Sequence, residues 1–294
     1  MNRRLVVFPL LFAAAIAMGS EPPADSAGTF TFLPATRPFP PLAANWQEPR
    51  VGVRKQFGTS HLKLDIGSAL DFLEIDPSAD RTQSLRVGAE FFTYALTTSS
   101  QGLRLQVDAV DGYFGGHIVY LSHQDRSTTA LRLRLLHLSA HFLDGHYDLQ
   151  LGQWKDGRAP IPFTRDFGEL TMAWTADLRS AVLRVYSGFA YATLVRPTDI
   201  DRFSTLHGVE LYSLGIPGRA LGKPASIYVA DNVTVAGVPA WTATNSLEAG
   251  IKFGGWDGSG IRVYLSYYHG REIYSQYYNV LTDQWGLGFS FDVR

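Results

Sequence analysis

The sequence predicts an all-β protein, an antiparallel transmembrane β-barrel of about 12 strands preceded by a signal peptide and a proline-rich arm. Three observations predict this fold. Apolar and polar residues alternate from about Phe57 to the C-terminus, which is the period of a β-strand. The alternating segments run about ten residues, against five or six in a typical strand. Long connections also interleave with short turns, as they do in membrane barrels.

The composition narrows the class of protein. The 294 residues are 46% hydrophobic and 18% charged, with a formal net charge of −1 and no cysteine. A chain this apolar is not expected to be disordered. Its net charge is close to zero, so it lacks the positive charge that attracts nucleic acids. The absence of cysteine excludes disulfide scaffolds and thiolate metal sites. A soluble β-sandwich shows the same alternation as a barrel, and it remains the alternative fold.

The N-terminus predicts export. Arg3 and Arg4 precede an apolar run over 5–18, and Ala15-Ile16-Ala17 offers small residues for cleavage, so residues 1–20 are predicted to be a secretory signal peptide. Seven prolines then fall within residues 21–56, which we expect to form a flexible linker or an extended arm. Part of that arm, around Phe39 and Trp46, is apolar enough to dock on the barrel domain expected over 57–294. Export without cysteine favours the bacterial outer membrane.

The strand pattern is clearest in five segments. Apolar residues share one parity over 103–109, 131–135, 181–191, 261–267 and 287–293. Arginines fall on the opposite, lumen-facing parity, where they either line a pore or pair with carboxylates such as Asp108 or Glu210. These arginines are Arg104, Arg132, Arg134, Arg184 and Arg262.

The connections set the direction of each predicted strand. Long loops at 269–283, 195–206 and 155–167 interleave with short turns at 256–260, 177–180 and 143–146. Short turns face the periplasm in outer-membrane barrels. If the turn at 143–146 faces the periplasm, the strand that ends near 143 runs toward the periplasmic rim of the barrel.

The last segment resembles the terminal strand of outer-membrane barrels. Gln284, Gly286, Phe289 and Phe291 are similar to that signature of polar residue, glycine, apolar residue and aromatic residue, although three residues follow the last aromatic. The resemblance implies recognition by the barrel-assembly machinery.

One stretch interrupts the alternation and carries candidate chemistry. His137 and Ser139 lie two apart on one strand, so their side chains share a face about 7 Å apart. They continue the apolar parity, where polar residues are costly and invite a functional interpretation. An imidazole placed in this way acts as general base for a serine when a third group orients it. Asp148 or Gln150, on the following strand of the predicted barrel, is the candidate for that third group.

Outer-membrane phospholipases and lipid A deacylases use a similar His-x-Ser pair on a barrel strand, completed by an acid or amide from the next strand. That similarity implies a serine-dependent lipid ester hydrolase. The alternative is a hydrogen-bond cluster at the membrane interface, which the expected periplasmic rim favours.

A metal site is a further candidate in the same stretch. Its ligands would be His141, Asp144 and His146, with His137 included only if the strand bulges. Residues four apart on a regular strand lie about 13 Å apart, too far to share one ion. A pair of metal ligands on either side of the predicted Asp144-Gly145 turn can approach each other more easily.

The segment from His137 to His146 also resembles part of an uncharacterised bacterial family of exported β-rich proteins. Members of that family carry a His-x-Ser-Ser-His-Leu-Gly-Asp-Glu segment. This chain has Ala140, Leu143 and Gly145 at the second serine, the glycine and the glutamate. Further blocks resemble the family at 39–43, 48–50, 208–212, Asp231, 267–270 and 275–278. The resemblance implies an envelope β-barrel and no known activity.

From the sequence we therefore expect an integral outer-membrane barrel that acts as a scaffold, a pore or a passage for small solutes. The alternative is a lipid hydrolase built on His137 and Ser139. Outer-membrane lipid and the assembly machinery are the expected partners, and no cofactor is expected.

Overall fold

The computed structural model describes residues 29–77, 82–100, 104–141, 147–154, 157, 159–220 and 222–292. The expected signal peptide lies outside this range. No helix in the described part of the chain is long and apolar enough to cross a membrane.

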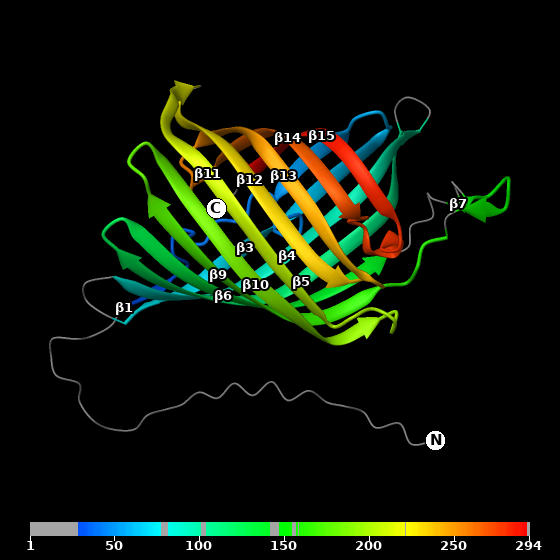
Figure 1. Ribbon diagram of the computed structural model, residues 1–294, viewed down its shortest axis with the longest axis horizontal. Helices are drawn as coiled ribbons and strands as arrows, with labels where there is room; N and C mark the ends of the chain where they lie inside the picture. Colours follow the sequence, from blue (N-terminus) through cyan, green and yellow to red (C-terminus); the bar gives the residue numbers. More distant parts are fainter. Residues whose placement is uncertain are drawn as a thin grey trace, which may run out of the picture.

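Twelve antiparallel strands close into a barrel (Figure 1). The ring is completed where the last strand, β15, pairs with β2 and β2 pairs with β3. The all-β barrel of about 12 strands predicted from the sequence is thereby confirmed. The wall consists of β2 (Val51–Gln56), β3 (His61–Asp76), β4 (Gln83–Ser100), β5 (Arg104–Gln124), β6 (Ser127–His141), β9 (Thr164–Asp177), β10 (Ala181–Arg196), β11 (Phe203–Ala220), β12 (Lys223–Gly237), β13 (Trp241–Gly254), β14 (Gly260–Arg271) and β15 (Leu281–Asp292).

The wall begins within the residues expected to form the arm. Strand β2 starts at Val51, and a short strand, β1 (Thr29–Phe32), adds to the end of β3 over Leu73–Asp76. The part of the arm between these two strands therefore has both of its ends fixed to the barrel.

The two faces of the wall differ as the alternation predicts. On β6, Leu131, Leu133 and Leu135 point outward and are 40%, 38% and 62% exposed, whereas Arg132 and Arg134 point inward and are buried. The predicted parity fails at one place on β5. The β4–β5 register shifts there, and this β-bulge turns Ala109 inward.

The longest connections between wall strands, 142–163 and 272–280, lie at one end of the barrel, here called the loop end, and the opposite end is called the turn end. Short connections occur at both ends, and 57–60 and 238–240 lie at the loop end. The turn end holds the connections at 125–126, 178–180 and 255–259, and β15 finishes beside the last of these. The loop end holds 197–202 and 272–280 (Figure 1).

The predicted turn at 143–146 is wrong. Strand β6 pairs directly with β9, so 142–163 is one long connection at the loop end. The residues counted as a barrel strand instead form a two-stranded hairpin of β7 (Tyr147–Asp148) and β8 (Gln153–Trp154) within that loop. Each of these strands has two residues, too few to span the wall.

Residues 33–50, the plug segment, run through the lumen rather than forming a linker outside the barrel. Proline supplies no N–H group, so this backbone cannot join a ladder and its carbonyl oxygens need other donors. Arginines supply them. Arg184 donates to the carbonyl of Pro40 at 3.0 Å, and Arg50 donates to that of Asn45 at 2.6 Å.

The ring of Phe39 anchors the plug segment by a different contact. The guanidinium groups of Arg132 and Arg184 both lie over this ring, with their central carbons 4.3 and 4.5 Å from its centroid. Cations over an aromatic ring are attracted by its π-electrons, most strongly where water is excluded.

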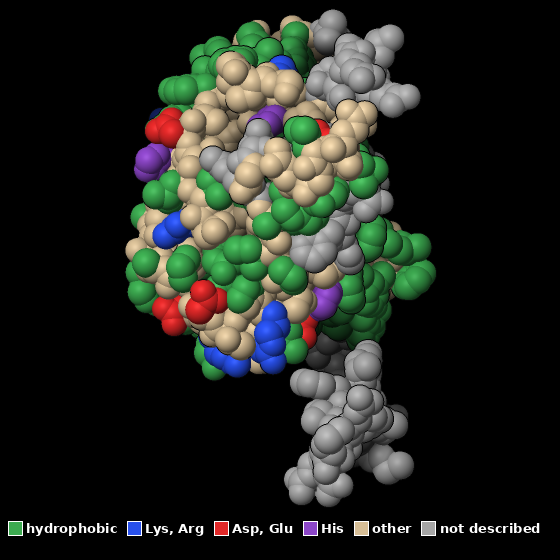
Figure 2. Space-filling view, turned by 90° about the vertical axis from the view of Figure 1, so that its right-hand side faces the viewer, with side chains coloured by type: hydrophobic (Ala, Val, Ile, Leu, Met, Phe, Trp, Pro, Cys, Tyr) green, Lys and Arg blue, Asp and Glu red, His purple; other side chains and the backbone are tan. Residues whose placement is uncertain are grey.

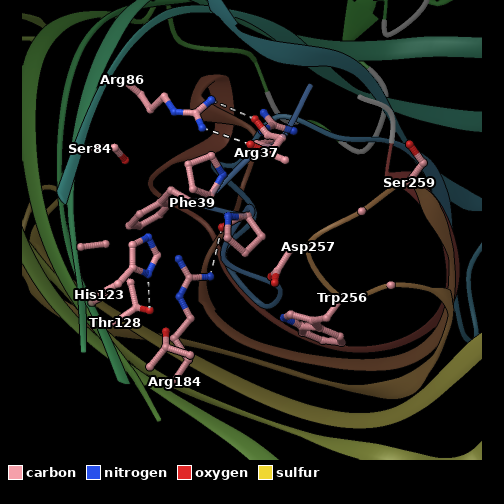
Figure 3. A pocket seen from close by; sticks show the side chains of 18 of the residues that line it. Arg37, Phe39, Ser84, Arg86, His123, Thr128, Arg184, Trp256, Asp257 and Ser259 are labelled. Atoms are coloured by element: carbon pink, nitrogen blue, oxygen red, sulfur yellow. Dashed lines mark hydrogen bonds between the residues drawn. The ribbon is translucent and has the colours of Figure 1, made fainter. Parts of the chain in front are cut away.

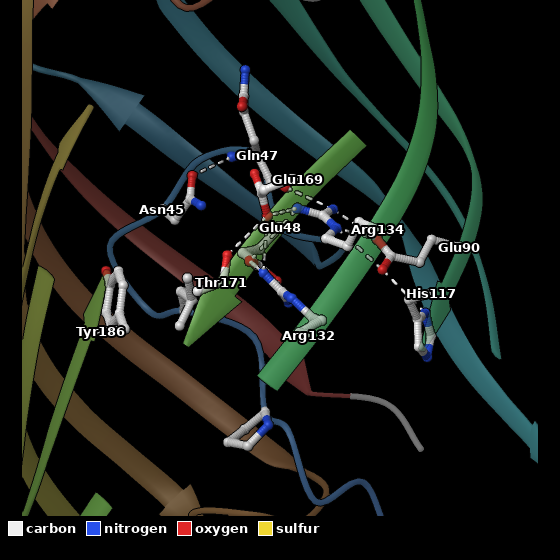
Figure 4. A network of polar contacts seen from close by, with 12 residues as sticks. Asn45, Gln47, Glu48, Glu90, His117, Arg132, Arg134, Glu169, Thr171 and Tyr186 are labelled. Atoms are coloured by element: carbon white, nitrogen blue, oxygen red, sulfur yellow. Dashed lines mark hydrogen bonds and ion pairs between the residues drawn. The ribbon is translucent and has the colours of Figure 1, made fainter. Parts of the chain in front are cut away.

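Buried charges bind the plug segment to the wall (Figure 4). Glu48 accepts two hydrogen bonds from Arg132, at 2.9 and 2.5 Å. Arg134 pairs with Glu90 at 2.7 Å and with Glu169 at 3.3 Å, and it also donates to the carbonyl of Gln47 at 3.1 Å. The arginines here pair with carboxylates rather than lining an open pore.

Glu48 is the only carboxylate that the plug segment itself contributes. Burial by itself would raise its pKa, but the guanidinium groups of Arg132 and Arg134 hold that pKa below its ordinary value. Glu48 therefore stays ionised at neutral pH. Its contribution to stability is lost only as the pH falls through this lowered pKa.

The loop end of the lumen is filled by the β14–β15 connection, which contains a short 3-10 helix, η3 (Ser275–Tyr277). Asp111 on β5 accepts hydrogen bonds from the backbone N–H of Ser275 at 3.0 Å and from its hydroxyl at 2.6 Å. Buried aromatic residues pack around this contact, and Figure 2 looks onto this end of the molecule. They include Phe92, Tyr94, Tyr113, Tyr268, Tyr274, Tyr277 and Tyr278.

We expect Glu48→Gln to destabilise the barrel, because it leaves Arg132 buried with only Glu169, 3.5 Å away, as a partner. Breaking a buried ion pair from one side costs about 3–5 kcal/mol. The measurement is the urea midpoint of the protein in detergent micelles, with Asp148→Ala, in the loop hairpin, as control. Equal midpoints for Glu48→Gln and the wild type would contradict the proposed anchoring.

Candidate functional site

His137 lies on the outer face of β6, near the strand's loop end. It follows Leu131, Leu133 and Leu135 on the same face, as the sequence predicts. Its ring packs against that of Phe114 on β5, with 4.7 Å between centroids. An imidazole on an otherwise apolar surface needs a polar partner for each of its ring nitrogens.

That partner is Asp166 on β9. His137 and Asp166 are directly opposed across the β6–β9 ladder, and 2.5 Å separates Nδ1 of the ring from Oδ1 of the carboxylate. A carboxylate only accepts hydrogen bonds, so Nδ1 carries the proton and Nε2 is the basic nitrogen of the neutral ring. The two side chains are 33% and 44% exposed, so the pair is open to the surroundings of the barrel.

Ser139 continues the same outer face one step closer to the loop end. Its cross-strand neighbours are Gly112 on β5 and Thr164 on β9. Gly112 has no side chain, and a Cβ built there would meet only the carbonyl of Ser139, at 3.8 Å. Residue 112 therefore contributes no side chain beside Ser139 on the β5 side.

Asp148, the orienting residue predicted from the sequence, does a different job. Its carboxylate accepts hydrogen bonds from the backbone N–H groups of Gln150 and Leu151, at 2.9 and 3.0 Å, and so shapes the β7–β8 turn. Asp166, and not Asp148, is the carboxylate that contacts the imidazole of His137. The error follows from treating 147–154 as the next wall strand, because the true neighbour, β9, begins at Thr164.

The predicted position of the pair along the barrel axis is also wrong. His137 and Ser139 lie toward the loop end, opposite the end where the C-terminal strand finishes. The sequence count had placed them near the short turns.

Most of the weaker metal candidates lie outside the described residues. Asp144 and His146 lie outside the described residues, and for His141 only the backbone is described. Within the described part of the chain, no group of three or more acidic or histidine side chains is placed to hold a metal ion.

Two further histidines face outward, and their surroundings show what is particular to His137. His207 on β11 is 2.9 Å from the hydroxyl of Ser187 on β10, a pair that the sequence analysis missed because it joins two strands. No carboxylate among the described residues contacts that ring. His269 pairs with Asp283 at 3.1 Å, but it has Tyr267 and Arg271 two residues away along the strand. Of these three, only His137 combines a carboxylate partner with a serine two residues along its face.

Comparisons with known proteins do not assign this chain to a family. No protein-family model and no curated protein matches the sequence. Two solved structures are similar to it at low identity. The outer membrane protein OprD from Pseudomonas aeruginosa has a TM-score of 0.30 and 8% identity, over 82% of this chain and 92% of that one. Outer-membrane expressed OmpT of Vibrio cholerae has a TM-score of 0.29 and 9% identity, over 82% of this chain and 98% of that one.

Proposed function

We propose that the protein is an integral outer-membrane β-barrel that hydrolyses a lipid ester at its outer surface. Ser139 is the nucleophile, His137 the general base and Asp166 the residue that orients the imidazole. The observation that carries this proposal is the 2.5 Å contact between His137 Nδ1 and Asp166 Oδ1, on the same outward face as Ser139.

The apolar outer face supports placement in a membrane. Large apolar side chains are exposed all around the wall, including Phe91 on β4, Leu135 on β6, Met172 on β9 and Leu287 on β15. A soluble monomer seldom exposes contiguous apolar patches larger than a few hundred Å². Lipid removes this cost, because its acyl chains are themselves apolar.

The two ends of the barrel support an orientation. Short turns lie on the periplasmic side of bacterial outer-membrane barrels, and longer loops lie outside. With the turn end toward the periplasm, the loop end and Ser139 lie near the outer leaflet. The ester bonds of a membrane lipid lie at the boundary between acyl chains and headgroups, which is the depth expected for a residue near the rim.

The chemistry follows from the three groups. Nε2 of His137 takes the proton of the Ser139 hydroxyl as its oxygen attacks the ester carbonyl. The carboxylate of Asp166 stabilises the imidazolium that forms. Collapse of the tetrahedral intermediate breaks the ester bond, and the imidazolium returns its proton to the departing alcohol. Water, activated by the same imidazole, then releases the fatty acid from Ser139.

The filled lumen makes a role as an open pore less favourable. The plug segment and the β14–β15 connection occupy the lumen with paired charges and packed aromatic rings. Passage of a solute requires displacement of these groups. A surface reaction requires no such movement.

The C-terminal strand supports a further proposal, that the barrel-assembly machinery recognises β15. This strand carries Gly286, Phe289 and Phe291 of the terminal signature, and it closes the ring by pairing with β2.

Placement in the membrane predicts the fractionation of the cell envelope. We expect the full chain to remain with the outer membrane after carbonate washing and to be released by detergent, because its apolar wall faces lipid. Recovery of folded protein from the periplasm without detergent would rule the placement out.

Catalysis predicts that Ser139→Ala and His137→Ala lower fatty-acid release from phospholipid–detergent mixed micelles by roughly 10³-fold or more. Asp166→Ala should lower the rate as well, because the ring loses its oriented tautomer. Ser187→Ala, in the other outward Ser–His pair, and Asp148→Ala are matched controls and should retain the wild-type rate. Equal release by the wild type and Ser139→Ala would reject the hydrolase.

A further inference from the structure

The turn end of the lumen contains a large cavity, here called the vestibule, of about 1000 Å³. Its floor is the plug segment at Arg37, Pro38 and Phe39, and Trp256 and Asp257 of the β13–β14 turn border it (Figure 3). A cavity of this size holds a small organic molecule.

Most charges around the vestibule are already paired. Arg86 forms an ion pair with Glu74 and donates hydrogen bonds to Thr36. Arg184 pairs with Glu210 at 3.4 Å. Asp76 accepts a hydrogen bond from the Thr29 hydroxyl at 3.2 Å.

Arg37 differs from these paired groups. Its side chain reaches the vestibule and two smaller adjoining hollows, and it makes no ion pair or hydrogen bond with any described residue. Burial lowers its pKa, and distant carboxylates, Glu48 first among them, offset this only in part. Arg37 is half-buried, and a half-buried cation without a direct partner can bind an anion through charge-assisted hydrogen bonds.

Asp257, on the β13–β14 turn, is an acidic side chain that borders the vestibule. Burial raises its pKa, and Lys252 and Arg184 are the nearby cations that partly compensate this effect. Among the described residues Asp257 forms no ion pair with Arg37, so the guanidinium can contact a bound anion.

The walls of the vestibule also offer an apolar surface about as large as one aromatic ring. Trp256 stacks on Tyr212, with ring centroids 4.1 Å apart and planes 13° apart, and this contact fixes its orientation. Pro38 and Pro40 of the plug segment line the same cavity. Such a wall favours a flat, apolar body over a hydrated inorganic ion.

We propose that the vestibule binds a small organic anion that carries an aromatic ring, with the anionic group on Arg37 and the ring against Trp256. This site is separate from the outer surface of β6 and opens at the opposite end of the barrel. Because Arg37 belongs to the plug segment, the ligand contacts the plug segment directly.

The test is calorimetric titration of the detergent-solubilised full chain with sodium benzoate, and separately with inorganic phosphate. We expect saturable benzoate binding that weakens about tenfold or more in Arg37→Gln, because a charge-assisted contact is lost. Arg219→Gln is the matched control. Its side chain donates to the carbonyl of Gly222 outside the vestibule, so benzoate binding should be unchanged.

A second variant separates the two parts of the proposal and protects it against misfolding of Arg37→Gln. Trp256→Leu should weaken benzoate binding, and any binding of phosphate should be unchanged. No saturable benzoate binding, or equal binding by the wild type and Arg37→Gln, would overturn the proposal. Phosphate binding as tight as that of benzoate would overturn the role of the ring.

Discussion

Neutralisation of the buried arginines in the lumen is the constraint on which the rest of the structure depends. A small closed barrel must fill its interior, and buried guanidinium groups are tolerated only with partners close by. The wall supplies Glu90 and Glu169, and the plug segment supplies Glu48. The plug segment is thus a structural part of the barrel. Its proline-rich backbone suits this position, because side-chain donors of the wall satisfy carbonyl groups that no β-ladder could.

The proposed catalytic residues lie on the outer wall and not in the filled lumen. His137, Asp166 and Ser139 occupy two neighbouring strands, whose pairing fixes the imidazole opposite the carboxylate. Strand geometry holds such groups more firmly than loops would. The vestibule lies at the other end of the barrel, so the proposed reaction and the proposed ligand site are separated by the length of the wall.

The alternation in the sequence predicted strands and the outward direction of His137, because a period of two acts within one strand. Strand length and the spacing of the connections were also needed to favour a barrel of about 12 strands over a sandwich. It could not identify Asp166, since that contact joins strands separated by a long loop whose β7–β8 hairpin imitates a wall strand. The inward turn of Ala109 depends on a shift between two strands, which no single strand encodes. The course of the plug segment likewise depends on partners such as Glu210, which lie far away in the sequence.

The most direct test of the filled lumen is the electrical conductance of the purified full chain in a planar lipid bilayer. The account predicts insertion without stepwise current at moderate voltage, because the plug segment and η3 occupy the lumen. A stable, ohmic channel formed by the wild-type protein would contradict it.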